Sequence, residues 1–335
     1  MKKRVIVVMP GRGSYGTSEL GYLKRYHGGQ AEFLSRGALQ NDAASISELD
    51  GLKTFSPSKH LAGRNASNLI YACALLDFQK INRDKYEIVA ICGNSLGWYL
   101  TLAASGALSI ENGAQLVDTM GHLMEDNGTG SQFLYPITDE NWHRDPAKTG
   151  QVNSLLQSLD DMYYSIDLSG TAVLAGSETS VKKMMNALPK IDYFPLRLPK
   201  HAAFHTPLMS PIAKMAKQAL RQELFTQPKI PIIDGRGVIW RPRSTDMSAL
   251  YDYTLGAQIT SCYNFAKSIE VAIKEFAADQ LILTGPGSSL GPPAAQELIR
   301  HSWFGLTSKQ DFKALQDKAP VLLSMGREDQ RRDVI

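Results

Sequence analysis

The sequence predicts an α/β protein in which a parallel sheet carries helices on its faces. Short β-branched runs, at residues 4–9 and 86–92, alternate with stretches rich in Leu and Ala, at residues 67–80 and 96–107. This alternation is typical of βαβ units. A further strand is predicted at residues 280–284, where an apolar run ends in a Gly-Pro-Gly turn.

Composition places the chain among soluble globular proteins. It has 335 residues, of which 43% are apolar and 21% charged, and its net charge is only +3. Such a small charge gives no reason to expect nucleic acid or a membrane surface as a partner. The first apolar run spans only residues 5–9, and no later run reaches the ~18 residues that a spanning helix needs. Three widely separated cysteines, Cys73, Cys92 and Cys262, fit free thiols, so we expect a cytoplasmic protein.

The middle of the chain has a different pattern of predicted helices and strands from its two ends. An amphipathic helix at residues 111–125 ends in a cluster of turn residues, and a strand follows at 132–135. Strand-like residues 163–168 and 171–176 are separated only by Ser-Gly, which favours a hairpin. Such a compact mixed unit looks like an insertion.

These patterns predict three divisions of the chain. Residues 1–130 and 200–310 form one discontinuous subdomain, and residues 131–199 form the inserted small one. Within the second stretch of the large subdomain, a helix is predicted at residues 207–224. Residues 311–335 are a C-terminal tail that ends in a charged run, which favours a solvated end.

The most informative motif is Gly-Asn-Ser-Leu-Gly at residues 93–97. It follows a strand-like run and precedes a helical one, which is the context of a nucleophile elbow. On such a turn the Ser95 hydroxyl is exposed, and the next amide points at the group that the serine attacks. The alternative is an ordinary turn of small residues between a strand and a helix.

A nucleophilic serine needs a base, and histidine is the usual one. Seven histidines are present, and spacing alone does not select among them. The context of His205 is distinctive, because a loop delivers it to a helix start with Thr206 as cap and Pro207 as the next residue. From the residues alone, a surface histidine near a helix start is the competing interpretation.

Several ordered blocks carry a family resemblance. They read PGRGS at residues 10–14, GNSLG at 93–97 with ASGALS at 104–109, AAFHTPLM at 202–209, and QITS at 258–261 with GPG at 285–287. In this order they resemble the PGQGSQ, GHSLGE, AFHSPLM and QxTSP blocks of the malonyl-CoA:acyl carrier protein transacylase family, the acyltransferases of fatty acid and polyketide synthesis. The matches cover residues 4 to 300.

The resemblance implies an α/β-hydrolase-like large subdomain with an inserted ferredoxin-like small subdomain. It also implies that Ser95 attacks the thioester of an acyl-CoA, with His205 as the base. The phosphopantetheine thiol of an acyl carrier protein then takes the acyl group. The main-chain amides of Arg12 and Leu96 form the implied oxyanion hole, and the main-chain carbonyl near Gln258 orients His205.

The chain departs from the family at the acyl pocket. Where the family has an arginine that binds the malonyl carboxylate, this chain has Met120, which suits an uncharged acyl group. The alternative is that Met120 is a core residue and that the pocket is built differently. Arg12 stands in place of the family's glutamine, and its side chain offers a second cation for the substrate carboxylate, from the opposite wall of the pocket. In the family, a phenylalanine at the position of Phe204 accompanies malonyl as the substrate. Asn94 and Trp98 also replace family residues beside the elbow, and Trp98 either covers the pocket mouth or packs on the sheet.

The predicted function is therefore acyl transfer from acyl-CoA to an acyl carrier protein, with malonyl as the default group. The alternatives are a transferase for acetyl or another uncharged acyl group, a trans-acting acyl hydrolase, a non-catalytic docking module, and an ordinary esterase. We expect a monomer that needs no organic cofactor and no metal, because no ligand or phosphate motif is present. Arg12, Lys200 and His201 are candidate cations for the CoA diphosphate.

Overall fold

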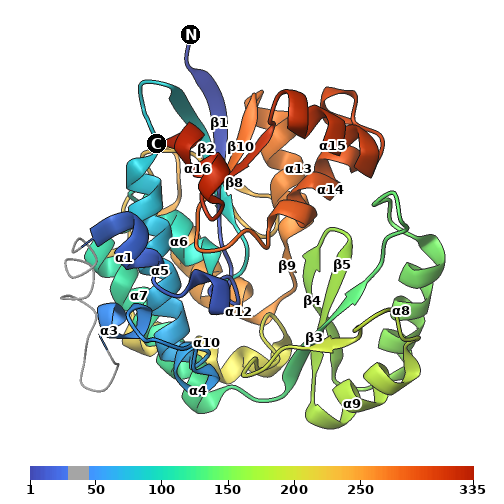
Figure 1. Cartoon of the computed structure of the whole chain (residues 1–335). Helices are drawn as coiled ribbons and strands as arrows, with labels where there is room; N and C mark the ends of the chain where they lie inside the picture. The colour runs from blue at the N-terminus through green and yellow to red at the C-terminus, as the bar shows by residue number, and fades with distance from the viewer. Residues whose placement is uncertain (29–44) are drawn as a thin grey trace.

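Two sheets organise the chain, of which the computed structural model describes residues 1–28 and 45–335 (Figure 1). The larger sheet has the strand order β11-β10-β1-β2-β7-β8, and the smaller sheet has the order β6-β3-β5-β4-β9. The protein is therefore a mixed α/β protein, as the sequence predicts.

The larger sheet is parallel except at one edge. It comprises β1 (Lys3–Met9), β2 (Tyr86–Gly93), β7 (Ile232–Ile233), β8 (Ile239–Trp240), β10 (Gln280–Leu283) and β11 (Leu322–Ser324). Only β8 pairs in the antiparallel sense, with β7. Residues 5–9 of β1 have no exposed surface, because helices cover both faces. An uninterrupted apolar run, rather than alternation, is what such a strand requires.

Helices lie on both sides of this sheet (Figure 1). One group is α5 (Gly63–Lys80), α6 (Gly97–Ala104) and α7 (Ile110–Asn127), and the other includes α13 (Phe265–Phe276), α14 (Gly291–Arg300) and α15 (Lys309–Lys318). The helices predicted at residues 67–80, 96–107 and 111–125 are confirmed. Short helices near the N-terminus are η1 (Thr17–Glu19), α1 (Tyr22–His27), α3 (Ile46–Asp50) and α4 (Pro57–His60).

The smaller part is built in the order β3 (Ser131–Pro136), α8 (Pro146–Ser158), β4 (Met162–Leu168), β5 (Thr171–Gly176), α9 (Glu178–Ala187) and β6 (Leu196–Arg197). The predicted hairpin is confirmed, because β4 and β5 pair antiparallel. This β-α-β-β-α-β order is consistent with a ferredoxin-like unit. One strand comes from outside residues 131–199: β9 (Tyr263–Asn264) pairs with β4 and joins the two parts.

Strand alternation gives the small sheet two different faces. Phe133 and Tyr135 of β3 pack into a small core with α8 and α9. Their neighbour Leu134 points the other way, toward the large part, and so does Val173 of β5. The period of two along each strand therefore supplies one wall of the space between the two parts.

The helix predicted at residues 207–224 is shorter and interrupted. A 3-10 turn, η3 (Pro207–Met209), precedes α10 (Ser210–Ala219), and η4 (Gln222–Leu224) follows it. Thr206 occupies the cap position but does not cap the helix with its side chain. Its hydroxyl donates instead to the Ala203 carbonyl at 2.6 Å, which stabilises the loop carrying His205.

The prediction of a solvated C-terminal tail is wrong. Residues 322–324 form β11 at the edge of the large sheet, and α16 (Glu328–Val334) follows. Arg331 in α16 is only 4% exposed and donates to the buried Asp77 carboxylate at 2.7 Å. It also donates to the Tyr22 hydroxyl at 3.0 Å. The charged run misled the prediction because one of its charges has a buried partner that is distant in sequence.

The ion pair between Arg331 and Asp77 should contribute measurably to stability. Replacing Arg331 by Met removes the permanent cation from the buried Asp77 carboxylate, whose other ion-pair partner is His27 at 2.9 Å. We expect this to cost about 3 kcal/mol of unfolding free energy. The neighbouring Arg332 pairs with Glu328 at the surface, so Arg332→Met is the matched control and should cost less than about 0.5 kcal/mol. Urea unfolding of both variants measures the difference, and equal losses would contradict the assigned role of Arg331.

Candidate active site

Ser95 lies on the sharp turn between β2 and α6. Its φ of +56° is a left-handed conformation that serine rarely adopts outside such turns. The two flanking glycines are needed for close packing. A Cβ on Gly97 would lie 2.5 Å from the Met9 carbonyl oxygen, and a Cβ on Gly93 would lie 2.6 Å from the Gly97 carbonyl carbon. The predicted strand-turn-helix context of the motif is therefore present.

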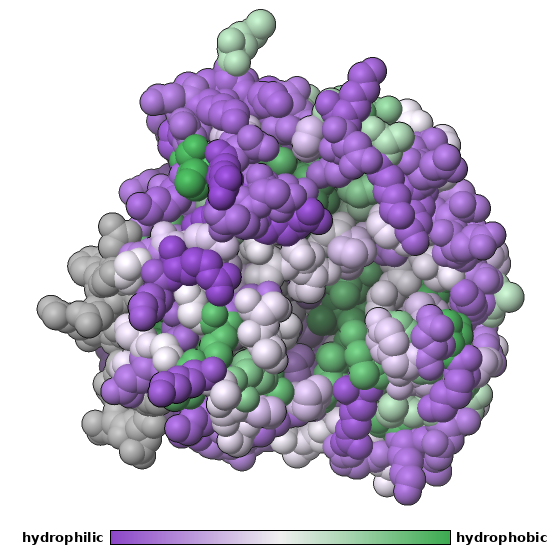
Figure 2. All heavy atoms as spheres, viewed as in Figure 1, coloured by the Kyte–Doolittle hydropathy of each residue, from purple (hydrophilic) through white to green (hydrophobic). Residues whose placement is uncertain are grey.

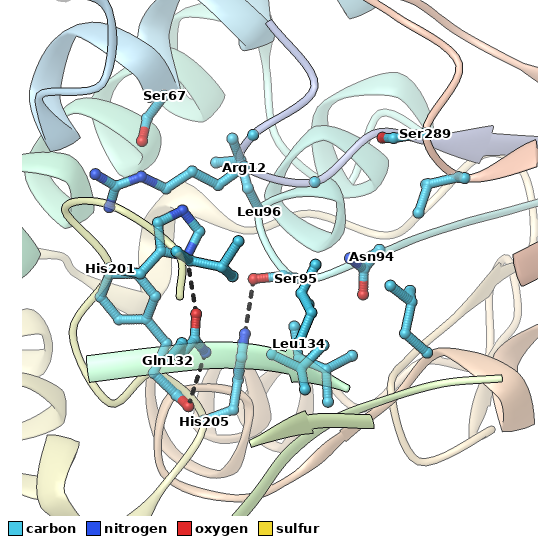
Figure 3. A pocket seen from close by; sticks show the side chains of 18 of the residues that line it. Arg12, Ser67, Asn94, Ser95, Leu96, Gln132, Leu134, His201, His205 and Ser289 are labelled. Carbon is cyan, nitrogen blue, oxygen red and sulfur yellow. Dashed lines mark hydrogen bonds between the residues drawn. The ribbon is translucent and has the colours of Figure 1, made fainter. Parts of the chain in front are cut away.

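His205 comes from the loop before η3 and meets this serine. The Ser95 Oγ and His205 Nε2 atoms are 2.7 Å apart (Figure 3). The other ring nitrogen, Nδ1, is 2.6 Å from the main-chain carbonyl of Gln258. Because a carbonyl only accepts, Nδ1 carries the proton and Nε2 presents its lone pair to the serine hydroxyl. The dyad and the orienting carbonyl predicted from the sequence lie together.

The segment around Gln258 also supports the elbow. The Gln258 side-chain amide donates to the Ser95 carbonyl at 3.2 Å, and the Tyr99 hydroxyl donates to its Oε1 at 2.9 Å. Gln258 begins α12 (Gln258–Thr260), after a π-helical turn, η5 (Tyr253–Ala257), and α11 (Met247–Asp252). The Tyr263 hydroxyl donates to the Gly93 carbonyl at 2.7 Å. These bonds fix both ends of the serine turn to the segment that orients His205.

Burial sets the charge state of the base. His205 is 5% exposed, and this burial lowers the pKa of its imidazole to about 4, although the hydrogen bond to Gln258 works in the opposite direction. The ring is therefore neutral at pH 7 and able to accept a proton. Ser95 itself is partly exposed, so a substrate reaches the hydroxyl without any movement of the base.

A second histidine belongs to a relay of hydrogen bonds behind the dyad. The Ser165 hydroxyl donates to the Phe204 carbonyl at 2.7 Å, and the Gln132 amide nitrogen lies 2.5 Å from the Ser165 oxygen. The Gln132 oxygen therefore accepts from His201 Nδ1, at 2.8 Å, which leaves the His201 Nε2 lone pair free. Burial and the nearby Arg12 hold the pKa of His201 well below its usual value. His201 is thus neutral, and its predicted role as a cation is wrong.

The role of Lys200 as a cation for the CoA diphosphate stays a prediction. Its ammonium group donates to the Ser58 carbonyl at 3.1 Å, and Lys200 does not line the pocket described below. Sequence reasoning missed Gln132 and Ser165 altogether, because they lie within ordinary strands and no motif marks them.

A pocket of about 360 Å³ surrounds the dyad, between the two parts of the molecule. Figure 2 shows an apolar hollow on this face. Its floor contains the elbow and His205, and its walls are largely apolar. The small sheet and its flanks contribute Leu134, Ile166, Leu168, Val173, Phe194 and Leu198, and the large part contributes Val117, Met120, Met124, Leu290, Pro292 and Pro293. Such a shape suits an acyl group whose carbonyl carbon lies at the serine.

Three of the four predicted pocket residues line this space. They are Asn94, Met120 and Phe204. Trp98 does not line the pocket, so of its two alternatives the place at the pocket mouth is wrong and packing in the interior is confirmed. Its side chain is fully buried beneath α6, where the indole nitrogen donates to the Thr254 hydroxyl at 3.0 Å and the ring lies edge-on to Tyr253. Trp98 follows Gly97 on the helix face that packs against the core, so its size fills that core rather than the pocket mouth.

The amides of Arg12 and Leu96 border the same space. Both residues line the pocket, and within residues 1–28 and 45–335 neither amide donates to another group. Leu96 immediately precedes the first residue of α6, so its amide belongs to the electropositive end of that helix. Their role as an oxyanion hole stays a prediction.

Among residues 1–28 and 45–335, no group of three or more His, Cys, Asp or Glu side chains has an arrangement suited to a metal ion. In the same part of the chain, no helix combines the length and the apolar character required to cross a bilayer.

The low pKa of His205 predicts the pH dependence of Ser95 reactivity. The neutral base persists down to about pH 4, so the rate of Ser95 labelling by a fluorophosphonate should change little between pH 7.5 and 5.5. An imidazole with the ordinary pKa of about 6.5 would lose roughly tenfold over this range. Intact-protein mass spectrometry measures the rate, and circular dichroism checks the fold at each pH. A tenfold fall would contradict the buried, neutral base.

Comparison with known proteins gives distant sequence relatives. No protein-family model matches the chain. The malonyl CoA-acyl carrier protein transacylase of Salmonella typhimurium is 25% identical over 212 residues, which are 60% of this chain and 63% of that protein. A non-reducing polyketide synthase of Aspergillus flavus is 28% identical over 150 residues, which are 44% of this chain and 7% of the synthase. The match thus spans less than two thirds of the length of each relative.

Solved structures match along nearly the whole chain. The acyl-carrier-protein S-malonyltransferase of Burkholderia pseudomallei has a TM-score of 0.76 at 17% identity, with 99% of each chain covered. The malonyl-CoA:ACP transacylase of Synechocystis has a TM-score of 0.73 at 18% identity, covering 99% of this chain and 100% of that one. At such identities these matches show a shared fold. In sequence and in fold, the chain thus resembles the malonyl-CoA:acyl carrier protein transacylases and polyketide synthases' acyltransferases, which confirms the resemblance that its motifs predict.

Proposed function

We propose that this protein is an acyltransferase that moves an acyl group from acyl-CoA to the phosphopantetheine thiol of an acyl carrier protein. The observation that carries the proposal is the Ser95–His205 pair, with Oγ and Nε2 2.7 Å apart inside an apolar pocket. The named activities of the relatives support the same reaction class. In this interpretation the large part is α/β-hydrolase-like and the small part is ferredoxin-like, with the pocket between them.

The first step forms an acyl-serine. Ser95 Oγ attacks the thioester carbonyl while its proton passes to His205 Nε2, and the carbonyl oxygen becomes an oxyanion. The amides of Arg12 and Leu96 stabilise that charge, because they are free to donate and Leu96 lies at a helix start. The carbon–sulfur bond then breaks, and His205 returns the proton to the leaving CoA thiol.

The second step repeats this chemistry in reverse. The carrier thiol gives its proton to His205, and its sulfur attacks the acyl-serine carbonyl. The bond to Ser95 Oγ breaks, and His205 returns the proton to that oxygen. Throughout, the Gln258 carbonyl holds Nδ1–H and stabilises the imidazolium that forms in each step. The apolar walls limit access of water, which would otherwise release the acyl group as a free acid.

The remaining attributes follow from this reaction. Acyl-CoA and an acyl carrier protein are the two partners, and no cofactor is needed because serine and histidine supply the nucleophile and the base. We propose a cytoplasmic monomer, since both substrates are soluble molecules of intracellular biosynthesis. Malonyl is the default acyl group.

An acyl hydrolase is the second candidate, and Met120 favours it. Met120 is 3% exposed and lines the pocket where the resemblance implies an arginine. With that cation absent from α7, this wall accepts acyl groups that lack a carboxylate. A hydrolase differs only in the second step, in which water replaces the carrier thiol.

One experiment separates the two functions. The protein is incubated with a panel of acyl-CoAs and analysed by intact mass spectrometry, and then given acyl carrier protein in its phosphopantetheine form. We expect an acyl adduct on the wild type, no adduct on Ser95→Ala, and a rate lower by roughly 10²- to 10⁴-fold in His205→Ala. Acyl groups recovered on the carrier support transfer, whereas free acid in the presence of carrier supports hydrolysis. An adduct on Ser95→Ala would overturn both.

A further inference from the structure

The Arg12 side chain has unused donors inside the pocket. Its Nη2 donates to the main-chain carbonyls of Leu61, at 2.9 Å, and Lys200, at 3.0 Å. The guanidinium lies over the Phe204 ring, 5.4 Å from the ring centre. Its Nε and Nη1 atoms donate to no group in the described chain. Two neutral carbonyls hold the cation in place without neutralising it.

The charge of Arg12 is poorly compensated. Burial lowers the pKa of its guanidinium to about 10, and only Glu125 acts against this. Glu125 is itself hydrogen-bonded to Arg64 at 3.2 Å and is exposed. A half-buried guanidinium with two free donors and no ion-pair partner of its own favours an anion from outside the protein.

Other polar groups gather beside this guanidinium. Ser67 of α5 is 6% exposed and lines the pocket, and its hydroxyl donates to no group in the part of the chain described. In the view of Figure 3, the Ser67 hydroxyl points toward the Arg12 side chain, and His201 lies between that side chain and Gln132. The pocket therefore has polar groups as well as apolar walls.

We propose that Arg12 and Ser67 form a carboxylate-binding subsite, so that the acyl group accepted by Ser95 carries a terminal carboxylate. This inference rests on the proposed function. The guanidinium comes from the loop after β1, whereas the resemblance implies an arginine at the Met120 position of α7. Both positions line one pocket, so a cation from either wall reaches a short carboxyacyl group such as malonyl.

The specificity follows from the cost of burial. A carboxylate beside Arg12 gains a charge-assisted hydrogen bond from one of the free guanidinium nitrogens, Nε or Nη1, and one from the Ser67 hydroxyl. An acetyl group offers nothing to these donors, so they remain desolvated and unpaired when the pocket is filled. The binding energy of the carboxylate is therefore available only to a carboxyacyl donor, and it sets the preference between two substrates of similar size.

The test compares two donors on the same variant. Rates of Ser95 acylation with malonyl-CoA and acetyl-CoA are measured by intact mass spectrometry, and their ratio is compared among variants. We expect the wild type to prefer malonyl, and Arg12→Met to lower the malonyl/acetyl ratio by roughly 10- to 100-fold. Ser67→Ala should lower it several-fold. A ratio taken within one variant is insensitive to the fraction of protein that is folded.

A rescue variant and a control variant test whether the charge of Arg12 causes the malonyl preference. Adding Met120→Arg to Arg12→Met returns a guanidinium to the same pocket from α7, and we expect it to recover much of the malonyl preference. Arg197→Met removes an exposed arginine that pairs with Glu178 outside the pocket, and it should leave the ratio unchanged. Recovery in the double variant would distinguish loss of charge from distortion of the loop.

The outcomes separate this inference from the function on which it rests. Adducts that form equally fast with both donors in the wild type, or a ratio unchanged in Arg12→Met, would overturn the carboxylate subsite and leave acyl transfer intact. Absence of any adduct on Ser95 with every acyl-CoA would instead overturn the proposed function. A lower ratio that Met120→Arg rescues supports both.

Discussion

The hydrogen bond from His205 Nδ1 to the Gln258 carbonyl is the interaction on which the candidate site depends. It fixes one tautomer of a buried imidazole and so directs a lone pair at the Ser95 hydroxyl. A carbonyl carries no full charge, so its hydrogen bond offsets the burial of His205 only in part, and the pKa of the ring stays low. The site therefore keeps a neutral base by desolvation, and its orienting group contributes direction and a partial negative charge rather than a full one.

This arrangement requires segments far apart in sequence to meet at one point. The serine turn belongs to the large sheet, and His205 lies on the loop where the chain returns from the small part. Gln258 bonds to both, and Tyr263 then connects the elbow to β9, which pairs with the small sheet. The pocket wall and the Ser95–His205 pair are thus held by the same junction. Alternation along β3 and β5 turns apolar side chains toward that junction, which explains why the pocket is apolar on the side opposite the serine.

Local patterns in the sequence predicted the features that depend on local geometry. Gly93 and Gly97 are required by contacts within one turn, and buried parallel strands require apolar runs, so the elbow and the three central strands β10, β1 and β2 of the large sheet followed from the residues. His205 needed the family resemblance, because its distance from Ser95 is set only by the fold. Arg331 was misjudged, and the place of Trp98 was left open, for the same reason: their partners, Asp77 and Thr254, are more than a hundred residues away. Gln132 and Ser165 carry no motif, and only their contacts identify them.

Arg12 and Met120 illustrate that a pocket needing a cation at one point does not need an arginine at one particular sequence position. A guanidinium is long, planar and always charged, so donors from different backbone positions are able to reach one point in a pocket. The proposed subsite requires a desolvated cation at that point, together with groups that hold it. Here the carbonyls of Leu61 and Lys200 hold the side chain, and Met120 fills the wall that an arginine would otherwise cross. A second cation on α7 beside the first would add repulsion inside a poorly solvated space, which gives a physical reason for an apolar residue at position 120 once Arg12 is present.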